Sequence, residues 1–163
     1  INKKFYDEAR KILPDNKYVG FSLTQGNLYR KKSWSVDKFI EVAKQVVKRN
    51  MIPVFFIQKE HVEIISLIKN QVKEAVFPEE LSSLTGPALV TALSSRLKQA
   101  ITIDNGIMHM ISLSNIPMIV LFGPTNSKKF APKNKFTKVL DSKKIHKTKD
   151  INSITVEEVF DLV

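Results

Sequence analysis

The chain has 163 residues, enough for one domain with a buried core and fewer than two full domains usually need. With 43% hydrophobic residues, 26% charged residues and no cysteine, the composition excludes disulfides, thiolate nucleophiles and cysteine-held zinc. No apolar run approaches the roughly 20 residues of a membrane helix, so we expect a globular protein of a reducing compartment such as the cytoplasm. Because the sequence begins with Ile1, we also expect it to be a piece of a longer protein.

The net charge of +10 admits nucleic acid, an anionic membrane or a phosphorylated ligand as partner. Lysines crowd the C-terminal third: Lys128, Lys129, Lys133, Lys135, Lys138, Lys143, Lys144, Lys147 and Lys149. We read no aromatic residues interleaved among them as base-stacking platforms, and so expect no nucleic acid. The alternative is an ordinary solvated surface.

The N-terminal part predicts a helix followed by two strand–helix units. Residues 2–13 have apolar side chains at helical spacing, and Pro14 ends the pattern. We therefore assign residues 1–17 to a lead-in helix or interdomain linker and residues 18–163 to the domain. Ser35 is the expected N-cap of the first helix in the domain, and Asn50 suits its C-terminal end. The predicted segments are strands over 18–23 and 53–57 and helices over 35–50 and 62–72.

The C-terminal part continues the alternation. A helical face runs from Leu89 to Leu97, and Thr155 and Glu158 have the spacing of a capping box before a last helix. Short apolar runs predict strands over 75–77, 101–103, 118–122 and 136–140. Alternating strands and helices predict a Rossmann-like α/β domain, a parallel sheet with helices on both faces.

Polar residues follow the strand predicted over 101–103. Asp104, Asn105 and Gly106 begin a helix, where unpaired backbone N–H groups favour an anion such as phosphate. Asp104 is itself negative, so we expect it to cap the helix or fix the turn, with direct ligand contact as the alternative. His109 can bond a phosphate oxygen or pair with Asp104, or be a histidine satisfied by the backbone.

Two further segments can reach the same crevice. After the strand over 118–122, Gly123 permits close backbone approach and the Thr125 hydroxyl can bond a ligand, although a plain turn explains both equally well. Lys31 and Lys32 face this crevice if the strands over 18–23 and 101–103 are neighbours at the switch point of the sheet. Otherwise they are a solvated pair.

Several chemistries are disfavoured. The sequence lacks the glycine-rich dinucleotide fingerprint, the P-loop and the Gly-x-Ser-x-Gly elbow of hydrolases. No histidine or carboxylate spacing suits a metal cluster, and His61 and His146 are isolated. We expect no protein-held metal and no cofactor. The residues alone thus predict a Rossmann-like domain with an anion-binding crevice.

Four segments in order resemble the C-terminal domain of glycosyltransferase family 9, the lipopolysaccharide heptosyltransferases. They are Lys32-Ser-Trp34, Leu84-Thr-Gly86, Asp104-Asn-Gly-Ile-Met-His109 and Leu121-Phe-Gly-Pro-Thr125. The resemblance covers about residues 18–163. It implies the GT-B fold, with two Rossmann-like domains, and transfer of a heptose from an ADP-sugar to the inner core of lipopolysaccharide in a bacterium.

The resemblance implies a role for each matching residue. Asp104, Asn105, Gly106 and His109 would line the donor site, Lys32 would contact the phosphates in place of a metal, and Thr24, Gln25 and Gly26 would form the loop beneath them. Thr125 belongs to the fourth matching segment. A carboxylate on the nucleoside side would fall on Glu60 or Glu63.

The resemblance also has consequences for the whole protein. The general base of the family lies in the N-terminal domain, so we expect this chain alone to bind donor weakly and to transfer nothing. The missing domain would meet the lipid-linked saccharide acceptor. The basic C-terminal surface would offer peripheral contact with the inner face of the inner membrane.

Because the sequence departs from the family pattern at several positions, more than one donor is consistent with it. Asn105 stands where the family usually has serine or threonine, residues 23–26 replace a His-Pro-Gly-like loop, and Ile57 and Gln58 replace a Gly-Gly pair. Two alternatives therefore remain. One is a GT-B transferase that uses a UDP-sugar, and the other is a non-enzymatic nucleotide- or nucleic-acid-binding module whose ligand meets the C-terminal lysines.

Overall fold

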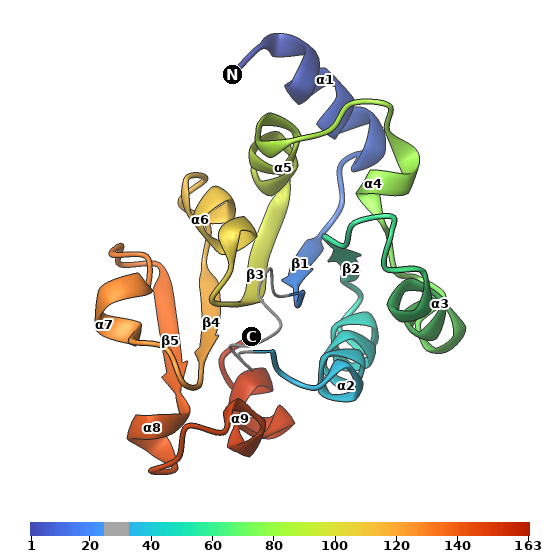
Figure 1. Cartoon of the computed structure of the whole chain (residues 1–163). Helices are drawn as coiled ribbons and strands as arrows, with labels where there is room; N and C mark the ends of the chain where they lie inside the picture. Colours follow the sequence, from blue (N-terminus) through green and yellow to red (C-terminus); the bar gives the residue numbers. More distant parts are fainter. Residues whose placement is uncertain (25–32) are drawn as a thin grey trace.

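The computed structural model describes residues 1–24 and 33–163, and its centre is a five-stranded parallel sheet (Figure 1). The strand order is β2-β1-β3-β4-β5, and every neighbouring pair is parallel. The strands are β1 (Tyr18–Ser22), β2 (Ile52–Phe55), β3 (Leu97–Ile103), β4 (Met118–Phe122) and β5 (Thr137–Asp141).

The strand predicted over 75–77 is reduced to a single parallel bridge between Val76 and Val54. The Val76 N–H donates to the Pro53 carbonyl at 2.9 Å, and the Phe55 N–H donates to the Val76 carbonyl at 2.8 Å. With this bridge counted as a strand, the order is that of the Rossmann fold, whose switch point lies between the first and fourth strands. Here those strands are β1 and β3, which are neighbours in the sheet.

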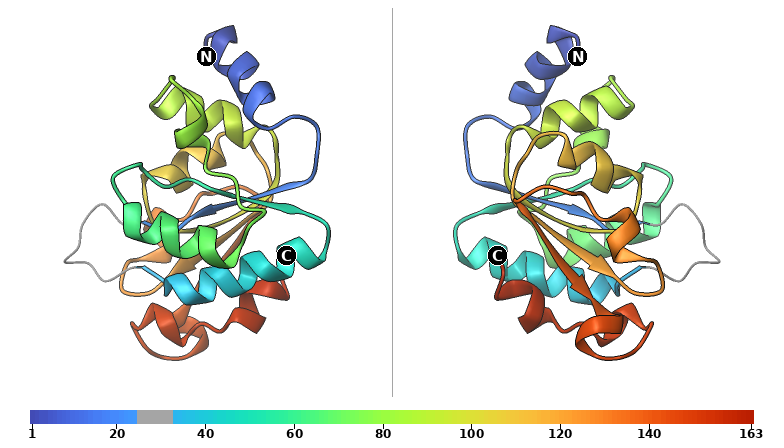
Figure 2. Two further views of the ribbon diagram at one scale, coloured as in Figure 1. Left: turned by 90° about the vertical axis from the view of Figure 1, so that its right-hand side faces the viewer. Right: turned by 90° about the vertical axis from the view of Figure 1, so that its left-hand side faces the viewer.

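Helices cover both faces of the sheet (Figure 2), which confirms the predicted fold class. One face carries α2 (Val36–Lys48), α3 (Val62–Gln71) and α9 (Val156–Phe160). The other carries α1 (Lys3–Ile12), α5 (Pro87–Ser94) and α6 (Gly106–Ser112). The short helices are α4 (Pro78–Leu81), α7 (Ser127–Phe130), α8 (Ser142–Ile145) and the 3-10 helix η2 (Ile151–Ser153).

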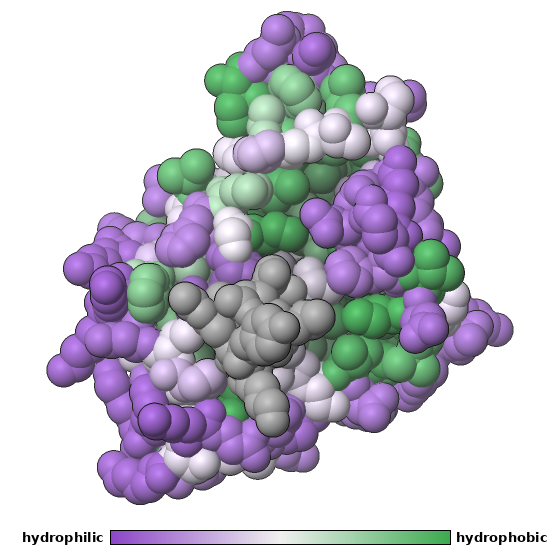
Figure 3. Space-filling model, in the orientation of Figure 1, coloured by the Kyte–Doolittle hydropathy of each residue, from purple (hydrophilic) through white to green (hydrophobic). Residues whose placement is uncertain are grey.

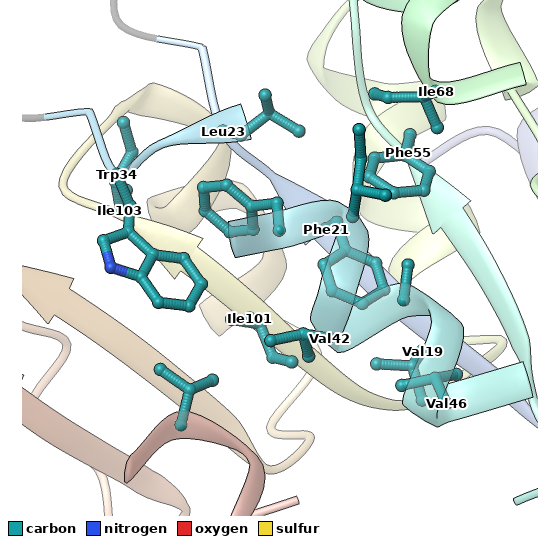
Figure 4. Close-up of a cluster of buried hydrophobic side chains, with 14 of the residues drawn as sticks. Val19, Phe21, Leu23, Trp34, Val42, Val46, Phe55, Ile68, Ile101 and Ile103 are labelled. Atoms are coloured by element: carbon teal, nitrogen blue, oxygen red, sulfur yellow. The ribbon is translucent and has the colours of Figure 1, made fainter. Parts of the chain in front are cut away.

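Two apolar layers form the core because strand side chains alternate between the faces. Phe21 stacks on Phe55 beneath α2, with ring centres 4.9 Å apart (Figure 4). Trp34 meets Phe39 edge-on, with ring centres 5.0 Å apart. The Trp34 indole N–H donates to the Ile154 carbonyl at 2.9 Å. The tryptophan of the Lys-Ser-Trp segment is thus a structural anchor that ties the start of α2 to the C-terminal segment.

The predicted helix ends are nearly correct in position but not all in mechanism. Thr155 and Glu158 form the expected capping box at α9. Asn50 follows Arg49, the C-cap of α2, so the expected cap is displaced by one residue; at a left-handed φ of 60°, Asn50 donates its N–H to the Val47 carbonyl as in a Schellman motif. Ser35 precedes α2, but its side chain makes no capping hydrogen bond among the described residues.

The prediction that Leu97 belongs to a helical face is wrong, because α5 ends at Ser94 and Leu97 opens β3. Leu93 and Leu97 are four residues apart, and both lie in the apolar layer under α5, so helix and strand fit this spacing equally. Of the helices that the structure describes, none is long and apolar enough to cross a membrane.

Candidate functional site

Asn105 joins β1, β3 and α6 at the switch point. Its Nδ2 donates to Ser22 Oγ at 2.8 Å and to the Thr24 carbonyl at 3.0 Å, and its Oδ1 accepts from the Met108 N–H at 2.9 Å. The expectation that Asp104 caps the helix is therefore wrong, because Asn105 is the N-cap of α6. Asparagine suits this position because one amide group both accepts the cap bond and donates to β1.

The exposed side of this turn is formed by Gly106 and His109. Gly106 is exposed, and a Cβ added there would meet no described atom within 4 Å. Neither packing nor a positive φ requires glycine here. His109 is exposed on the same helix, whereas the Asp104 carboxylate lies largely buried at the end of β3. The turn therefore leaves room beside Gly106.

A pocket of about 310 Å³ lies beside this turn, between the end of β2, the start of α5 and α6. Its walls are mainly apolar, and polar groups come from Gln58, Glu79 and Thr85. Figure 3 shows apolar side chains gathered over α5 on this face of the molecule. The apolar lining residues are Phe56, Ile57, Pro78, Pro87, Leu89, Val90, Leu93, Ile107 and Met110, with Gly86 completing the lining. Apolar walls with a few polar groups are typical of sites for small organic ligands.

The carboxylate that lines this pocket is Glu79 in α4. Glu60 lies exposed in the turn between β2 and α3, and Glu63 lies exposed in the first turn of α3. Neither lines the pocket, so their nucleoside role stays a prediction.

The turn after β4 is held by the ammonium group of Lys143. Its Nζ donates to the carbonyl of Gly123 and, at 2.7 Å, to that of Thr125, and it pairs with Asp141 at 3.0 Å. Asp141 also accepts from Ser127 Oγ at 2.6 Å. Burial raises the pKa of the Asp141 carboxyl, but the hydrogen bonds from Ser127 and Lys143 outweigh burial and lower it below its usual value. The carboxylate stays ionised and fixes Lys143 under the turn.

Within this turn, Gly123 and Thr125 face the protein. A Cβ on Gly123 would meet the Lys149 carbonyl and the Ile151 Cβ, both at 2.8 Å. Close backbone approach is thus real, but the neighbour is the C-terminal segment of the chain itself. In the part of the chain described, the Thr125 hydroxyl is buried without a hydrogen-bond partner, so a ligand reaches it only if the turn moves.

Some predicted residues are not brought to the site by this structure. Gln25, Gly26, Lys31 and Lys32 lie outside the described residues. Thr24 is half-buried, and its carbonyl holds Asn105. No group of three or more metal-binding side chains comes together in residues 1–24 and 33–163.

Four residues of the site carry no clear signal in the sequence. Ser22 ends an apolar run, and Glu79 lies in a four-residue helix. Asp141 and Lys143 are about twenty residues from the turn they hold. Only the hydroxyl at the end of a buried strand marks Ser22 as unusual, while the other three depend on tertiary packing.

Comparison with known proteins places this fold in a family. The family model for glycosyltransferase family 9 (heptosyltransferase) matches residues 1–159. A search of curated proteins found no match. Among solved structures, the chain is similar to a family 9 glycosyl transferase from Veillonella parvula DSM 2008, with 22% identity and a TM-score of 0.82 over 99% of this chain and 51% of that one.

Two Escherichia coli structures are also similar. ADP-heptose lps heptosyltransferase II shows 18% identity and a TM-score of 0.78 over 99% of this chain and 50% of that one. Heptosyltransferase WaaC with ADP-2-deoxy-2-fluoro heptose shows 15% identity and a TM-score of 0.74 over 96% of this chain and 46% of that one. The chain spans about half the length of these structures, as one Rossmann-like half of a GT-B glycosyltransferase does. The match over residues 1–159 shows that the chain belongs to glycosyltransferase family 9.

Proposed function

We propose that this chain is the donor-binding half of a heptosyltransferase-type enzyme and that its donor is a nucleoside diphosphate sugar. The donor that we propose is an ADP-sugar. The observation that carries the proposal is the apolar pocket, which is lined by Ile107, the residue that directly follows the open turn at Gly106. Ligands of open α/β sheets bind outside the carboxyl ends of the strands at the switch point, which is where this turn lies. The similar WaaC structure holds an ADP-sugar analogue, which supports the same donor class here.

In this proposal the nucleoside occupies the pocket. The base lies against Leu89, Val90 and Ile107, and the Gln58 amide can both donate to and accept from its edge. We assign the nucleoside-side carboxylate to Glu79, because it lines the pocket and can accept hydrogen bonds from ribose hydroxyl groups. Glu60 and Glu63 are the alternatives taken from the family resemblance.

The diphosphate and the sugar lie beside Gly106, where glycine lets the phosphate approach the backbone closely. His109 donates to a phosphate oxygen, and Lys32, with the loop of Gln25 and Gly26, adds positive charge and backbone donors. Asn105 holds the turn in place and does not bind the donor. Its side-chain amide already makes the cap hydrogen bond and two hydrogen bonds toward β1. Asp104 faces the sugar, and Thr125 joins the site if its turn moves.

The proposed chemistry follows from where the nucleoside, the diphosphate and the sugar lie. The groups beside Gly106 stabilise the negative charge that develops on the departing nucleoside diphosphate. A base outside this chain activates the acceptor hydroxyl, so the chain alone binds donor and transfers nothing. We propose that the acceptor is a lipid-linked saccharide of the lipopolysaccharide inner core, met at the cytoplasmic face of the membrane.

Titration of ADP, UDP and GDP into the isotope-labelled chain tests the proposal. We expect ADP to bind most tightly and to shift the amide resonances of Gln58, Gly86 and Gly106. Glu79→Gln should weaken ADP binding about tenfold or more, while Glu63→Gln, on the exposed face of α3, should leave it unchanged. Absence of any shift at Gly106 with all three nucleotides would sink the proposal.

The same titration separates the two alternatives. A UDP-sugar transferase would reverse the preference between ADP and UDP. A non-enzymatic module whose ligand meets the C-terminal lysines would lose binding in Lys144→Ala with Lys147→Ala and keep it in Glu79→Gln. Lys143 is unsuitable for this test, because it holds the carbonyl groups of the turn after β4.

A further inference from the structure

A second pocket, of about 340 Å³, lies at the carboxyl ends of β4 and β5, between the turn after β4 and the start of α8. Figure 1 shows β4 and β5 side by side, with β5 leading into α8. We call it the β4–β5 pocket. Among the described residues it shares none with the apolar pocket, so it is separate from the proposed nucleoside site. Its polar lining residues are Asn126, Ser127, Lys128, Asp141, Lys143 and Lys144.

The carboxylate of the β4–β5 pocket is already occupied. Asp141 is buried, accepts from Ser127 Oγ at 2.6 Å and from the Lys143 N–H at 2.9 Å, and pairs with the Lys143 ammonium at 3.0 Å. That ammonium also donates to two carbonyl groups of the turn after β4, so all three of its N–H donors have acceptors. The charges of Asp141 and Lys143 therefore cancel, and Lys143 has no donor left for a ligand.

The other polar groups of this pocket are positive or donate hydrogen bonds. In the part of the chain described, Lys128 and Lys144 are exposed and their ammonium groups have no carboxylate partner. Asn126 Oδ1 accepts from the Lys129 N–H at 3.2 Å, which leaves the side-chain NH2 group as a donor. The surrounding segment is positive as well, because residues 124–150 contain nine lysines and two aspartates. The β4–β5 pocket is therefore suited to an anion.

We propose that the β4–β5 pocket binds a phosphate group, either the free ion or the phosphate of a small phosphomonoester. Such a group carries a charge of about −1.5 to −2 at pH 7 and three strong acceptor oxygens, which match two ammonium groups and one amide donor. A carboxylate, with a single charge, would leave one ammonium group uncompensated. The pocket is no smaller than the apolar pocket, so it has room for the organic part of an ester.

A small phosphate ligand fits this pocket better than a nucleic acid does. The Lys129 ammonium lies 5.3 Å from the centre of the Phe130 ring, and the Lys135 ammonium lies 5.2 Å from that of Phe136. The reading that no aromatic residues are interleaved with the C-terminal lysines is therefore wrong. Neither ring lines the β4–β5 pocket, however, so the pocket offers no aromatic platform on which a base can stack.

Titration of the isotope-labelled chain with inorganic phosphate and with glycerol 2-phosphate tests the site. Both ligands should shift the side-chain amide resonances of Asn126, and the tighter of the two shows whether the site takes the free ion or an ester. Lys128→Gln with Lys144→Gln should weaken binding about tenfold or more, because both charged hydrogen bonds are lost. Lys133→Gln with Lys138→Gln removes the same charge at exposed positions outside the pocket and should retain most of the affinity.

Equal phosphate affinity of the two double variants would overturn the proposal, as would Asn126 resonances that neither ligand moves. Glu79→Gln separates this site from the apolar pocket, because it should weaken ADP binding and leave phosphate binding unchanged. Loss of phosphate binding in Glu79→Gln would place the phosphate in the donor site and overturn a second site. Tighter binding of a short single-stranded oligonucleotide than of either phosphate ligand, lost in the variant with Lys128→Gln and Lys144→Gln, would assign these lysines to nucleic acid instead.

Discussion

Asn105 is the residue on which the geometry of the switch point depends. It is 9% exposed, and its amide connects the N-terminus of α6 with Ser22 and Thr24 at the end of β1. Since these groups are largely shielded from water, an unpaired donor or acceptor among them is costly. In the proposed function, the side chain therefore shapes the donor crevice and does not contact the donor.

Replacement of Asn105 by threonine should show this role. Asn105→Thr keeps an oxygen for the Met108 N–H but loses the two donors toward β1, so the free energy of unfolding should fall by about 1–3 kcal/mol in urea denaturation. Ser35→Ala is the matched control, because the Ser35 side chain makes no cap bond among described residues. An unchanged midpoint for Asn105→Thr would contradict the bridging role.

Two glycines of the site should respond in opposite ways to the same added methyl group. Gly106→Ala should leave stability unchanged or raise it by up to about 1 kcal/mol, because a Cβ meets no described atom there and alanine favours helices. The same change should weaken ADP binding about tenfold or more. Gly123→Ala should cost about 1–3 kcal/mol, because its Cβ would overlap the Lys149 carbonyl and Ile151.

Denaturation and calorimetric titration of both glycine variants separate these effects. If Gly106→Ala binds ADP like the parent chain, the phosphate does not approach the backbone at this turn. If Gly123→Ala is as stable as the parent, the C-terminal segment is not packed against the turn after β4.

The elements of this fold differ in how far the sequence determines them. The strand over 118–122 was predicted to the residue, because Pro117 and Gly123 bound its apolar run. The boundary at Leu97 was missed, because one leucine spacing suits both α5 and β3. The four-residue helices α4, α7 and α8 have too few residues for a helical pattern, so tertiary contacts decide them.

In the candidate site, too, the sequence predicts what a local pattern marks and misses what tertiary contacts bring together. Residues 104–109 were found because polar side chains after a buried strand form a local pattern. The apolar pocket draws on residues 56–58, 78–79, 85–93 and 107–110, and no local pattern connects segments so far apart. Side-chain geometry also decided between Asp104 and Asn105 as the cap, since both residue types favour that position.

The junction of β5 and α8 should make stability sensitive to acid. The pKa of Asp141 is lowered in the folded protein, so the unfolded chain binds more protons near that pKa. The stabilisation from this carboxylate is therefore complete above the ordinary carboxyl pKa of about 4 and is lost as the pH falls through the lower folded-state value.

Asp141→Asn measures this contribution. The variant should be about 1–3 kcal/mol less stable than the parent chain at neutral pH, and the difference should shrink as the pH falls below about 4. Urea denaturation over a pH series checks this, with Asp161→Asn, an exposed position in the last residues of the chain, as the control. A stability difference that stays constant at every pH would contradict the ionic role of Asp141.

At the scale of the whole molecule, α2, α9 and the C-terminal segment are tied together by Trp34 and its bond to the Ile154 carbonyl. The first and last parts of the domain therefore share one core, and unfolding should be a single cooperative transition. Ligand binding at the switch point should then stabilise the entire chain.

Thermal unfolding with nucleotide tests this coupling. ADP at about 100 times its dissociation constant should add about 2.7 kcal/mol to the free energy of unfolding and raise the midpoint of one transition. UDP at the same concentration should raise it less, and Glu79→Gln should reduce the ADP effect. A second transition that ADP leaves unmoved would mean that the C-terminal segment unfolds separately.

The two edges of the sheet are unequal. The outer edge of β2 is occupied by the bridge to Val76, whereas no described strand pairs with the outer edge of β5. Like charges such as that of Lys138 keep an open edge from pairing with another copy. If these charges were neutralised, two copies could join β5 to β5 in a closed, two-fold pair. Because the opposite edge is blocked, such pairing would end at two chains and would not continue into a fibre.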